Sequence, residues 1–518
     1  MGKLSQHLDT SLRYLCSVIV WMGYVLNNLD KTHHENVRSV RNSLYSIMST
    51  FFNKYTKFTW DEDSTSAMMS VFVWKILPKF ETDFTRSTSG LIQILSSWSK
   101  VEKYHFLFSR IESSGASRIL EVICKVLCNP AANPKLVFTI LTILHNLTTV
   151  EDVEMMETDS SGSKKLGVEI VLKEINVILN YFQTWIKVSN ENVKNIKKVG
   201  IKLDILVTLA PHISSQDECL ILFKQLLTLS NSLKKPESVL KVLTISKLLV
   251  HKIPAQELPS LVADLIPFFG RIPTRNERLE LTCVIENCTQ YDSSLNLVSE
   301  ICSNLNSFDK KRIEEPDFEK RMRLFRKIRD LSLQSAELSP IELKSIIFNC
   351  CFFLKNETES SLKANALEAL NSVTKLFCQL NEPEALKELI DKICLDHIKA
   401  GIKNKDDSIR CDFLTFLQSL VTNCSESSQR LKDLSKLIDS DPDSNLLENL
   451  RHVQLHRRGR AMAKIAAHLE EDKNFIKTKN LTQLFLPLAG SYLLNDNYSK
   501  NSDLLDQSIS LVKSIARY

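Results

Sequence analysis

The sequence from residue 339 to residue 380, SPIELKSIIFNCCFFLKNETESSLKANALEALNSVTKLFCQL, decides the fold. Its start, Ser339-Pro340-Ile341-Glu342, is a capping box with proline at the first helical position, where the serine oxygen accepts from an orphan N–H and the glutamate reaches back. Apolar residues then recur at helical spacing, first over 340–355 and again over 361–380. The second stripe comprises Leu362, Ala366, Ala369, Val373, Phe377 and Leu380. The stretch predicts two amphipathic helices joined by a short link.

Further pairs of the same kind are predicted on both sides of this stretch. A helix over 258–269 precedes one near 276–290, and a helix over 384–400 precedes one over 408–423. Each pair takes about 40 residues, the spacing of HEAT and armadillo repeats. One pair cannot bury its apolar face alone, so neighbouring pairs must stack. We therefore predict an all-α fold, an α-solenoid of HEAT/armadillo-like helix pairs, with on the order of a dozen pairs.

Some helix ends carry weaker signals than the capping box. Asn381 with Glu384 repeats the spacing of a side-chain cap. Gly270 and Gly401 stand where a left-handed C-terminal cap is expected, because glycine adopts that conformation without strain. We therefore predict a cap at each of these positions.

The composition agrees with a helical array. The 518 residues include only 11 Gly and 14 Pro, and the net charge is +5, too small for a chain that binds nucleic acid over its whole surface. The 13 cysteines include no CxxC pair, and Cys124, Cys283 and Cys350 lie on apolar faces, which indicates a reducing compartment, the cytosol or nucleus. The uncharged stretch Tyr14–Leu26 is too short to span a bilayer and predicts a buried core helix.

One segment interrupts the helical pattern. Residues 151–165, EDVEMMETDSSGSKK, hold five acids and a Ser/Gly run, and we predict an acidic disordered loop there. An inert insertion is the default interpretation, and a phosphorylation site is the alternative. We accordingly predict N-terminal helical repeats over 1–150, middle repeats over 166–308 and C-terminal repeats over 309–518.

A search for chemistry finds no catalytic motif. The sequence has no phosphate-binding GxxxxGK[ST], no HExxH and no GxSxG. Cys124 and Cys128, with His145 downstream, lack a fourth zinc ligand in register, and spacing by four on an apolar face favours core packing. His33-His34-Glu35 is interpreted as a polar helix start. We predict a protein that is not an enzyme and that has no cofactor, no metal site and no small-molecule substrate.

The first of two basic segments follows Pro316. A helix there is expected to turn Phe318, Met322, Phe325 and Ile328 inward. Its arginines, Arg321 among them, are expected to lie largely on the other sides of the helix, as on an amphipathic helix with a solvated face.

The second basic segment is DPDSNLLENLRHVQLHRRGRAMAKIAAHL, residues 441–469. Asp441 as N-cap and Pro442 at N1 predict one helix, on which Arg457 falls inside the apolar stripe. Either Arg457 packs its stem and pairs with a neighbouring carboxylate, or Gly459 breaks the register. Cations around much of the circumference suggest a ridge that docks RNA or protein. The candidate docking residues are Arg451, His452, Gln454, His456, Arg457, Arg458 and Arg460.

This string, followed by LTQLFLPLAGSYLL over 481–494, resembles the DRIM (down-regulated in metastasis) family, HEAT-repeat component twenty of the small-subunit processome. The similarity lies in an acidic start, a His-x-Gln-x-His-Arg-Arg-x-Arg-Ala core over 452–461 and the later Pro487. Leu446-Leu447 replaces an aromatic pair usual in that family, and Gly459 stands where alanine is frequent.

The resemblance implies a scaffold in the nucleus and nucleolus, bound to the U-three small nucleolar RNA particle. It implies a role in processing the precursor of 18S ribosomal RNA, with pre-ribosomal RNA and processome proteins as partners and no membrane. Because the family's members are several times longer, we expect an internal piece of a solenoid. Two alternatives stay open, a HEAT-repeat transport receptor or adaptor that binds protein cargo, and the helical part of a larger enzyme.

Overall fold

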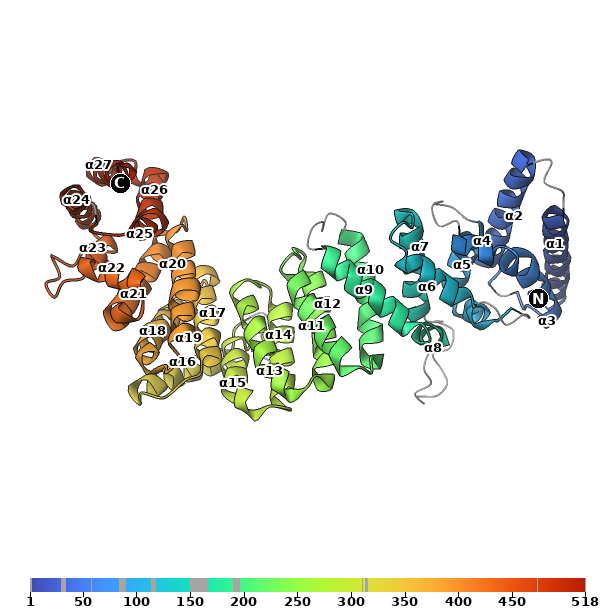
Figure 1. Cartoon of the computed structure of the whole chain (residues 1–518), viewed down its shortest axis with the longest axis horizontal. Coiled ribbons are helices and arrows are strands. Elements are labelled where there is room, and N and C mark those ends of the chain that lie inside the picture. The colour runs from blue at the N-terminus through green and yellow to red at the C-terminus, as the bar shows by residue number, and fades with distance from the viewer. Residues whose placement is uncertain are drawn as a thin grey trace. The chain divides into compact units, whose positions relative to one another are not determined.

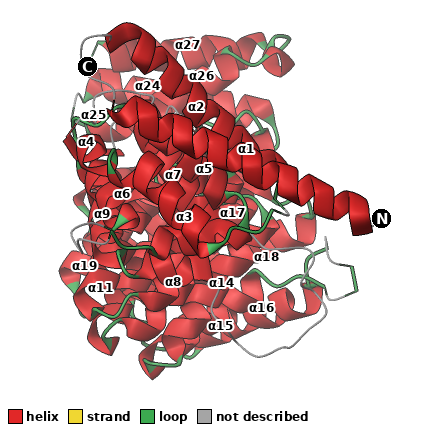
Figure 2. Ribbon diagram, turned by 90° about the vertical axis from the view of Figure 1, so that its right-hand side faces the viewer, coloured by secondary structure: helices red, strands yellow, loops and turns green. Residues whose placement is uncertain are grey.

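The computed structural model describes residues 2–28, 34–56, 58–82, 90–112, 118–149, 166–189, 196–309, 311–312, 315–472 and 474–517. Helices account for nearly all regular structure in these ranges (Figure 2), and β pairing is limited to the isolated bridges Ile111–Arg118 and Phe308–Pro316. The all-α prediction is confirmed. The acidic segment 151–165 lies outside the described residues. No helix in these ranges is long and apolar enough to cross a membrane.

The chain divides into two compact units, Met1–Ile253 and Pro254–Tyr518. In the first unit, helices from successive pairs contact one another in two rows (Figure 1). One row comprises α2 (His34–Lys54), α5 (Gly90–Ser99), α7 (Pro134–Thr149), α10 (Ile196–Leu209) and α12 (Pro236–Leu249). The other comprises α4 (Leu77–Thr82), α6 (Ile119–Cys128), α9 (Ile175–Ser189) and α11 (Gln216–Ser230). The remaining helices of this unit are α1 (Gly2–Asn28), α3 (Glu62–Met69) and α8 (Leu166–Leu172).

The second unit continues the pattern of paired helices, and one core of buried apolar residues runs through it from Ile301 to Ile515. Its first helices are α13 (Leu258–Leu265), α14 (Arg275–Thr289), α15 (Asn296–Leu305), α16 (Phe318–Leu333), α17 (Pro340–Asn356), α18 (Ser360–Leu376) and α19 (Pro383–Glu388). Then come α20 (Leu395–Ile402), α21 (Asp407–Cys424), α22 (Gln429–Leu434), α23 (Leu446–Leu450), α24 (Leu455–Glu471), α25 (Thr478–Asn480), α26 (Leu486–Leu493) and α27 (Ser502–Ala516).

Side-chain hydrogen bonds reveal the period of the array. The Tyr104 hydroxyl donates to the Tyr55 carbonyl 49 residues earlier, at 3.2 Å. In the second unit, the Asn423 amide donates to the Thr374 hydroxyl, also 49 residues away, at 2.8 Å. Other bonds between neighbouring pairs span fewer residues, 42 from Lys252 to the Ala210 carbonyl and 40 from Ser332 to the Ser372 carbonyl, so the spacing of the pairs varies from about the expected 40 residues to nearly 50.

The predicted helix pairs are confirmed where the sequence signal is strongest. α17 and α18 occupy the stretch 339–380, and α13 with α14 and α20 with α21 form the flanking pairs. The Ser339 hydroxyl accepts from the Glu342 N–H at 3.4 Å, and the Glu342 carboxylate accepts from the Ser339 N–H at 2.7 Å, so the capping box is present. Five of the six residues in the second apolar stripe of that stretch are fully buried.

The prediction of a buried core helix over Tyr14–Leu26 is wrong. In α1, Cys16 and Ile19 are buried, but Tyr14 is 72% exposed and Trp21 is 65% exposed. The residues are apolar all round the helix, but the chain's described residues pack against one side only. The sequence shows which residues of a helix are apolar and which of them share a face. Whether that face is buried depends on the elements that pack against it.

The predicted caps at Asn381, Gly270 and Gly401 are also wrong. α19 begins after Glu382, and no side chain caps it. Neither glycine has a left-handed backbone, and Gly401 lies within α20. A Cβ built on Gly401 would lie 2.1 Å from Cδ2 of Phe413. Close packing of α20 against α21, rather than a turn conformation, therefore requires this glycine.

The predicted orientation of α16 is wrong for Arg321 and Phe318. Arg321 is buried, whereas Phe318 is 41% exposed. The guanidinium donates to the Ser307 carbonyl at 3.4 Å and to the Glu357 carboxylate at 3.3 Å, and it lies 5.2 Å from the ring of Phe353. A guanidinium can be buried when its donors are satisfied, and these partners come from other helices and loops.

We predict that Gly401→Ala lowers the free energy of unfolding by about 1–3 kcal/mol, because the buried Phe413 ring must shift. The control is Gly490→Ala in α26, where a Cβ meets nothing within 4 Å. Removing helical glycine there should stabilise by up to about 1 kcal/mol. Urea unfolding followed by circular dichroism measures both. Equal effects of the two substitutions would contradict the packing argument.

Candidate docking surface

The basic segment 441–469 does not form one helix. Asp441 lies in a turn, where its carboxylate accepts from the Ser444 hydroxyl at 2.8 Å. The N-cap of α23 is Asn445, whose side chain accepts from the Glu448 N–H at 3.1 Å. The predicted cap at Asp441 and helix start at Pro442 are therefore wrong. The side chains of Asp441 and Ser444 bind each other within the turn instead, as polar side chains commonly do before helices.

A turn after α23 resets the helical register. It runs through residues 451–454, with Val453 88% exposed, and α24 begins at Leu455. The expected inward position of Arg457 came from continuing one helix through this turn. In the structure Arg457 is half-buried and pairs with Asp443 at 3.2 Å, while Arg458 is the buried arginine. The register changes before Gly459, which lies inside α24.

Arg458 ties α24 to α21. Its guanidinium donates to both carboxylate oxygens of Asp407, at 2.8 and 3.0 Å, and to the His452 carbonyl at 2.6 Å. It also reaches the Tyr492 hydroxyl at 3.4 Å. Both bonds to Asp407 come from Nη1, while Nε binds the His452 carbonyl, so the guanidinium joins α21 to the turn before α24 and fixes the two helices against each other.

Asp407 also binds a second buried arginine. Arg410 donates to Asp407 at 2.9 Å and to the Tyr498 hydroxyl at 3.0 Å, and its other terminal nitrogen donates to the carbonyls of Asn404 and Lys405. One carboxylate thus lies between two guanidinium groups, on which the rings of Tyr492 and Tyr498 pack.

The titration behaviour of this cluster follows from the balance of burial and charge. Burial raises the pKa of Asp407, but hydrogen bonds and charge from Arg458 outweigh it, so the pKa lies below its ordinary value. Burial lowers the pKa of Arg458, yet its bonds to Asp407 raise the pKa above the ordinary value. Burial raises the pKa of Tyr492 to about 12. At neutral pH the cluster therefore holds an ionised carboxylate between two guanidinium cations.

The other predicted docking residues separate by exposure. Gln454, His456 and Arg460 are exposed. Arg451 and His452 are half-buried, and the Arg451 Nε donates to Gln418 at 3.1 Å. The structure thus makes Arg458 a packing residue and leaves the exposed residues as a candidate surface.

The exposed side of α24 carries a short basic stripe. His456, Arg460 and Lys464 are spaced by four residues and are all exposed, so they lie along one side of the helix over about 12 Å. Lys464 is not among the predicted docking residues, because it follows the last arginine of the basic segment. Helical spacing from Arg460 would have found it. We call His456, Arg460 and Lys464 the basic stripe.

The opposite side of α24 packs against α27 (Figure 1). The Ser508 hydroxyl lies 3.3 Å from the sulfur of Met462, and Gly459 approaches the backbone of Leu504. A Cβ built on Gly459 would be 3.7 Å from the Leu504 Cα, an ordinary van der Waals contact. This packing leaves only the outer side of α24 free to bind.

The ranges that the structure describes contain no group of three His, Cys, Asp or Glu side chains that could hold a metal ion. All 13 cysteines are free thiols. Cys124 and Cys350 are buried as predicted, whereas Cys283 is half-buried. Burial raises the pKa of Cys124, as expected for a thiol packed in a core.

Comparison with known proteins gives a family match over most of the chain. The family described as U3 small nucleolar RNA-associated protein 20, N-terminal, matches residues 1–406, a range that ends before the basic segment. U3 small nucleolar RNA-associated protein 20 of Schizosaccharomyces pombe is 23% identical over 87% of this chain. Its Saccharomyces cerevisiae counterpart is 21% identical over 95%. The chain spans only 18% and 19% of the lengths of these relatives.

Solved structures give weaker matches. An engineered protein aligns with a TM-score of 0.29 and 12% identity, covering 96% of this chain and 98% of its own. A structure of the Pds5–Scc1 complex aligns with a TM-score of 0.22 and 11% identity, covering 97% of this chain and 93% of its own. Scores this low do not assign a function.

We predict that Arg458→Ala lowers the free energy of unfolding by about 2 kcal/mol, because it removes a buried side chain and leaves the half-buried Asp407 with one guanidinium partner fewer. Arg460→Ala, on the same helix but exposed, should change it by less than about 0.5 kcal/mol. Hydrogen exchange of the amides in α21 and α24 localises the effect. Comparable losses of stability from both substitutions would contradict the role of the Arg458 contacts in holding α24 against α21.

The lowered pKa of Asp407 predicts an acid-dependent loss of stability. Its contribution is complete above the unfolded-state pKa of about 4 and disappears as pH falls through the lower folded-state pKa. The stability difference between the unmodified chain and Asp407→Asn should therefore be largest near neutral pH and shrink below pH of about 4. Asp506→Asn, at an exposed position of α27, is the control. A difference that is constant with pH would contradict the assigned charge.

Proposed function

The chain belongs to the U3 small nucleolar RNA-associated protein 20 family, and we propose that it acts as a non-catalytic scaffold of the small-subunit processome. The family match over residues 1–406 is the observation that carries this proposal. It also confirms the family resemblance drawn from the string 441–469. The relatives are named U3 small nucleolar RNA-associated proteins, and we extend that association to this chain.

The architecture supports a scaffold. Each unit consists of stacked helices whose apolar faces cover one another, which leaves long polar surfaces for binding. The ionisable clusters found among the described residues, such as Asp407 with Arg410 and Arg458, are consumed by internal hydrogen bonds. No sequence motif for catalysis competes with this proposal. Binding surfaces therefore account for the chain better than an active site does.

The basic stripe is the proposed contact with RNA. Arg460 and Lys464 are exposed cations one helical turn apart, and His456 extends their line. Guanidinium and ammonium groups bind phosphate oxygens, and such contacts hold a nucleic acid without selecting its sequence. Gln454 and Arg457 flank the stripe. Arg458 holds α24, which carries the stripe, against α21 through Asp407. The half-buried Arg451 and His452 lie in the turn that precedes α24.

We further propose that the chain works in the nucleolus. There it would hold pre-ribosomal RNA, the U-three small nucleolar RNA particle and processome proteins during processing of the 18S precursor. The free buried thiols are compatible with a reducing compartment. These partners belong to the proposal as a whole, since the chain covers about a fifth of the relatives' length.

Depletion of the protein, followed by Northern analysis of ribosomal RNA precursors, tests the function. Unprocessed precursors of 18S ribosomal RNA should accumulate, and the tagged protein should concentrate in the nucleolus. Normal 18S maturation after depletion would refute the proposal. Accumulation at the nuclear rim would favour a transport receptor instead.

Rescue with a charge variant tests the basic stripe. Arg460→Gln combined with Lys464→Gln should rescue less well and should bind a fragment of the 18S precursor with a weaker salt dependence. The slope of log affinity against log salt should fall by about 0.7 for each lost contact with single-stranded RNA. The matched control is Lys387→Gln with Lys392→Gln, which removes the same charge from exposed positions elsewhere in the unit. Equal losses for both double variants would contradict a local contact.

A further inference from the structure

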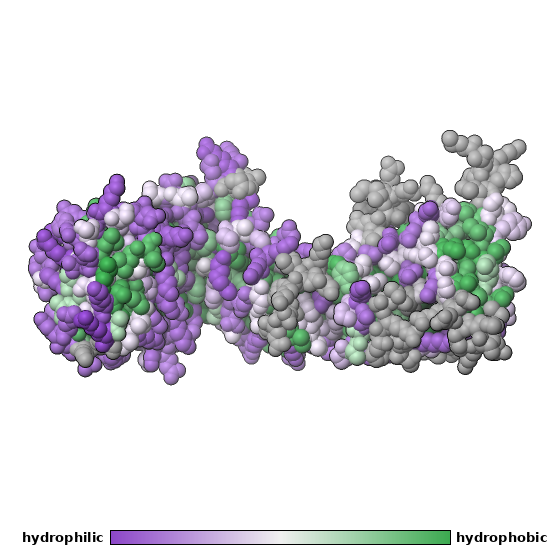
Figure 3. All heavy atoms as spheres, turned by 90° about the horizontal axis from the view of Figure 1, so that it is seen from above, coloured by the Kyte–Doolittle hydropathy of each residue, from purple (hydrophilic) through white to green (hydrophobic). Residues whose placement is uncertain are grey.

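The outer face of α1 is apolar and uncovered by the described chain. Tyr14, Val18 and Trp21 lie along one line of the helix and are 72%, 52% and 65% exposed. Leu15 and Met22 extend the same face. Figure 3 shows an apolar area on the surface at the end of the first unit that holds α1. Contiguous exposed apolar residues on a soluble protein mark an interaction site.

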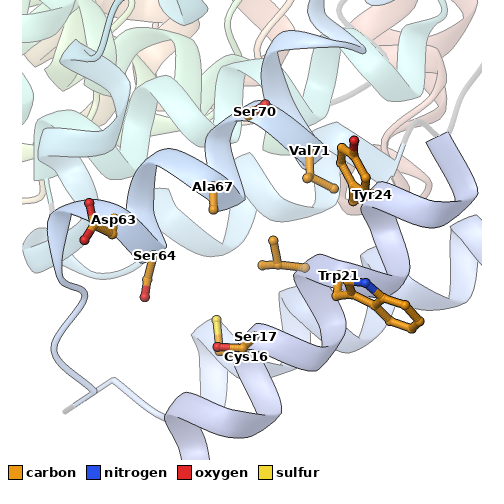
Figure 4. A pocket seen from close by; sticks show the side chains of 10 residues that line it. Cys16, Ser17, Trp21, Tyr24, Asp63, Ser64, Ala67, Ser70 and Val71 are labelled. Carbon is orange, nitrogen blue, oxygen red and sulfur yellow. The ribbon is translucent and has the colours of Figure 1, made fainter. Parts of the chain in front are cut away.

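A pocket adjoins this face. It lies between α1 and α3, with a volume of about 540 Å³, and Trp21 and Tyr24 line it from α1. Ala67 and Asp63 line it from α3. Figure 4 shows Asp63 at one end of the cavity and the two aromatic side chains at the other. Because Trp21 belongs both to the pocket and to the outer face, the two form one continuous surface.

The charge of the pocket favours a cationic partner. Three acids begin α3, and two of them are paired, Asp61 with Arg13 and Glu62 with Arg110. Asp63, the third, forms no ion pair within the described ranges, and it lines the pocket. Among the residues that the structure describes, no lysine or arginine lines this cavity. A phosphate chain would meet a carboxylate here and no cation, so the pocket does not suit RNA.

The spacing of the exposed residues favours a helical partner. Positions 14, 15, 18, 21 and 22 follow the i, i+1, i+4, i+7, i+8 pattern of a face that packs against another helix. A second copy of α1 would bring the same uncharged stretch from residue 14 to residue 28, and Arg13, the cation beside that stretch, is already paired with Asp61. The complementary partner is therefore a different helix.

We propose that this surface binds an amphipathic helix of a partner protein. The helix would insert an apolar side chain beside Trp21 and place a lysine or arginine next to Asp63. This is the helix-in-groove mode of recognition, in which apolar anchors supply affinity and a rim charge supplies orientation. The proposal goes beyond the scaffold function and does not depend on it.

The test is a selection against the full chain from a displayed library of helical peptides. The peptides hold leucine at i, i+4 and i+7 and are randomised at the flanking positions. Recovered peptides should carry lysine or arginine at one flanking position. Trp21→Ala should weaken a recovered peptide about tenfold, and Asp63→Asn about two- to fivefold, a loss that high salt removes. Circular dichroism should show both variants folded, because both residues are exposed.

The matched control is Asp217→Asn, which neutralises an exposed acid in the first turn of α11 in the same unit. It should leave peptide affinity unchanged. Three results would overturn the proposal: no peptide recovered, peptides without a basic preference, or peptides that bind the Trp21 and Asp63 variants normally. Binding of polyuridylate or self-association of the chain, if Trp21→Ala abolished it, would assign the surface to RNA or to a second copy instead.

Discussion

A pair of amphipathic helices cannot bury its apolar faces by itself, and this constraint shapes the whole chain. Each pair is covered by the next, so the core of the second unit extends without interruption from Ile301 to Ile515. Polar side chains cross the same boundaries, as between Tyr104 and Tyr55 or between Asn423 and Thr374. These hydrogen bonds fix how adjacent pairs align, which apolar contact alone specifies weakly because it has no direction.

Buried arginines reinforce the second unit at several pair boundaries. Arg278 donates to the side chains of Asn306 and Asn349, and burial lowers its pKa to about 9. Arg321, Arg410 and Arg458 are also buried with oxygen acceptors around them. A guanidinium has five donors in a fixed fork, so it can join several backbone and side-chain acceptors at once. The basic segment 441–469 therefore serves packing through Arg458 as well as offering exposed cations.

The same stacking explains which surfaces remain free. In α24 the side that carries Arg458 faces α21 and the Asp407 cluster, and the side that carries Gly459 faces α27. The basic stripe is what stays exposed. In α1 the buried side carries Cys16 and Ile19, and the apolar residues opposite them have no described neighbour. Proposed contacts with RNA and with a partner helix therefore fall in different units and have different chemistry.

The sequence alone determined that the chain is helical, where its strongest pairs begin and end, and which family it resembles. These properties depend on local signals, such as the capping box at Ser339, and on the 3.6-residue period of apolar side chains. Exposure was decided by tertiary structure. Because of the turn at 451–454, Arg458 rather than Arg457 is buried. Arg321 is buried because acceptors from distant segments surround its guanidinium. Close packing against Phe413, rather than a turn, requires Gly401. Periodicity identifies the residues on one side of a helix, but what covers that side depends on segments about one repeat away.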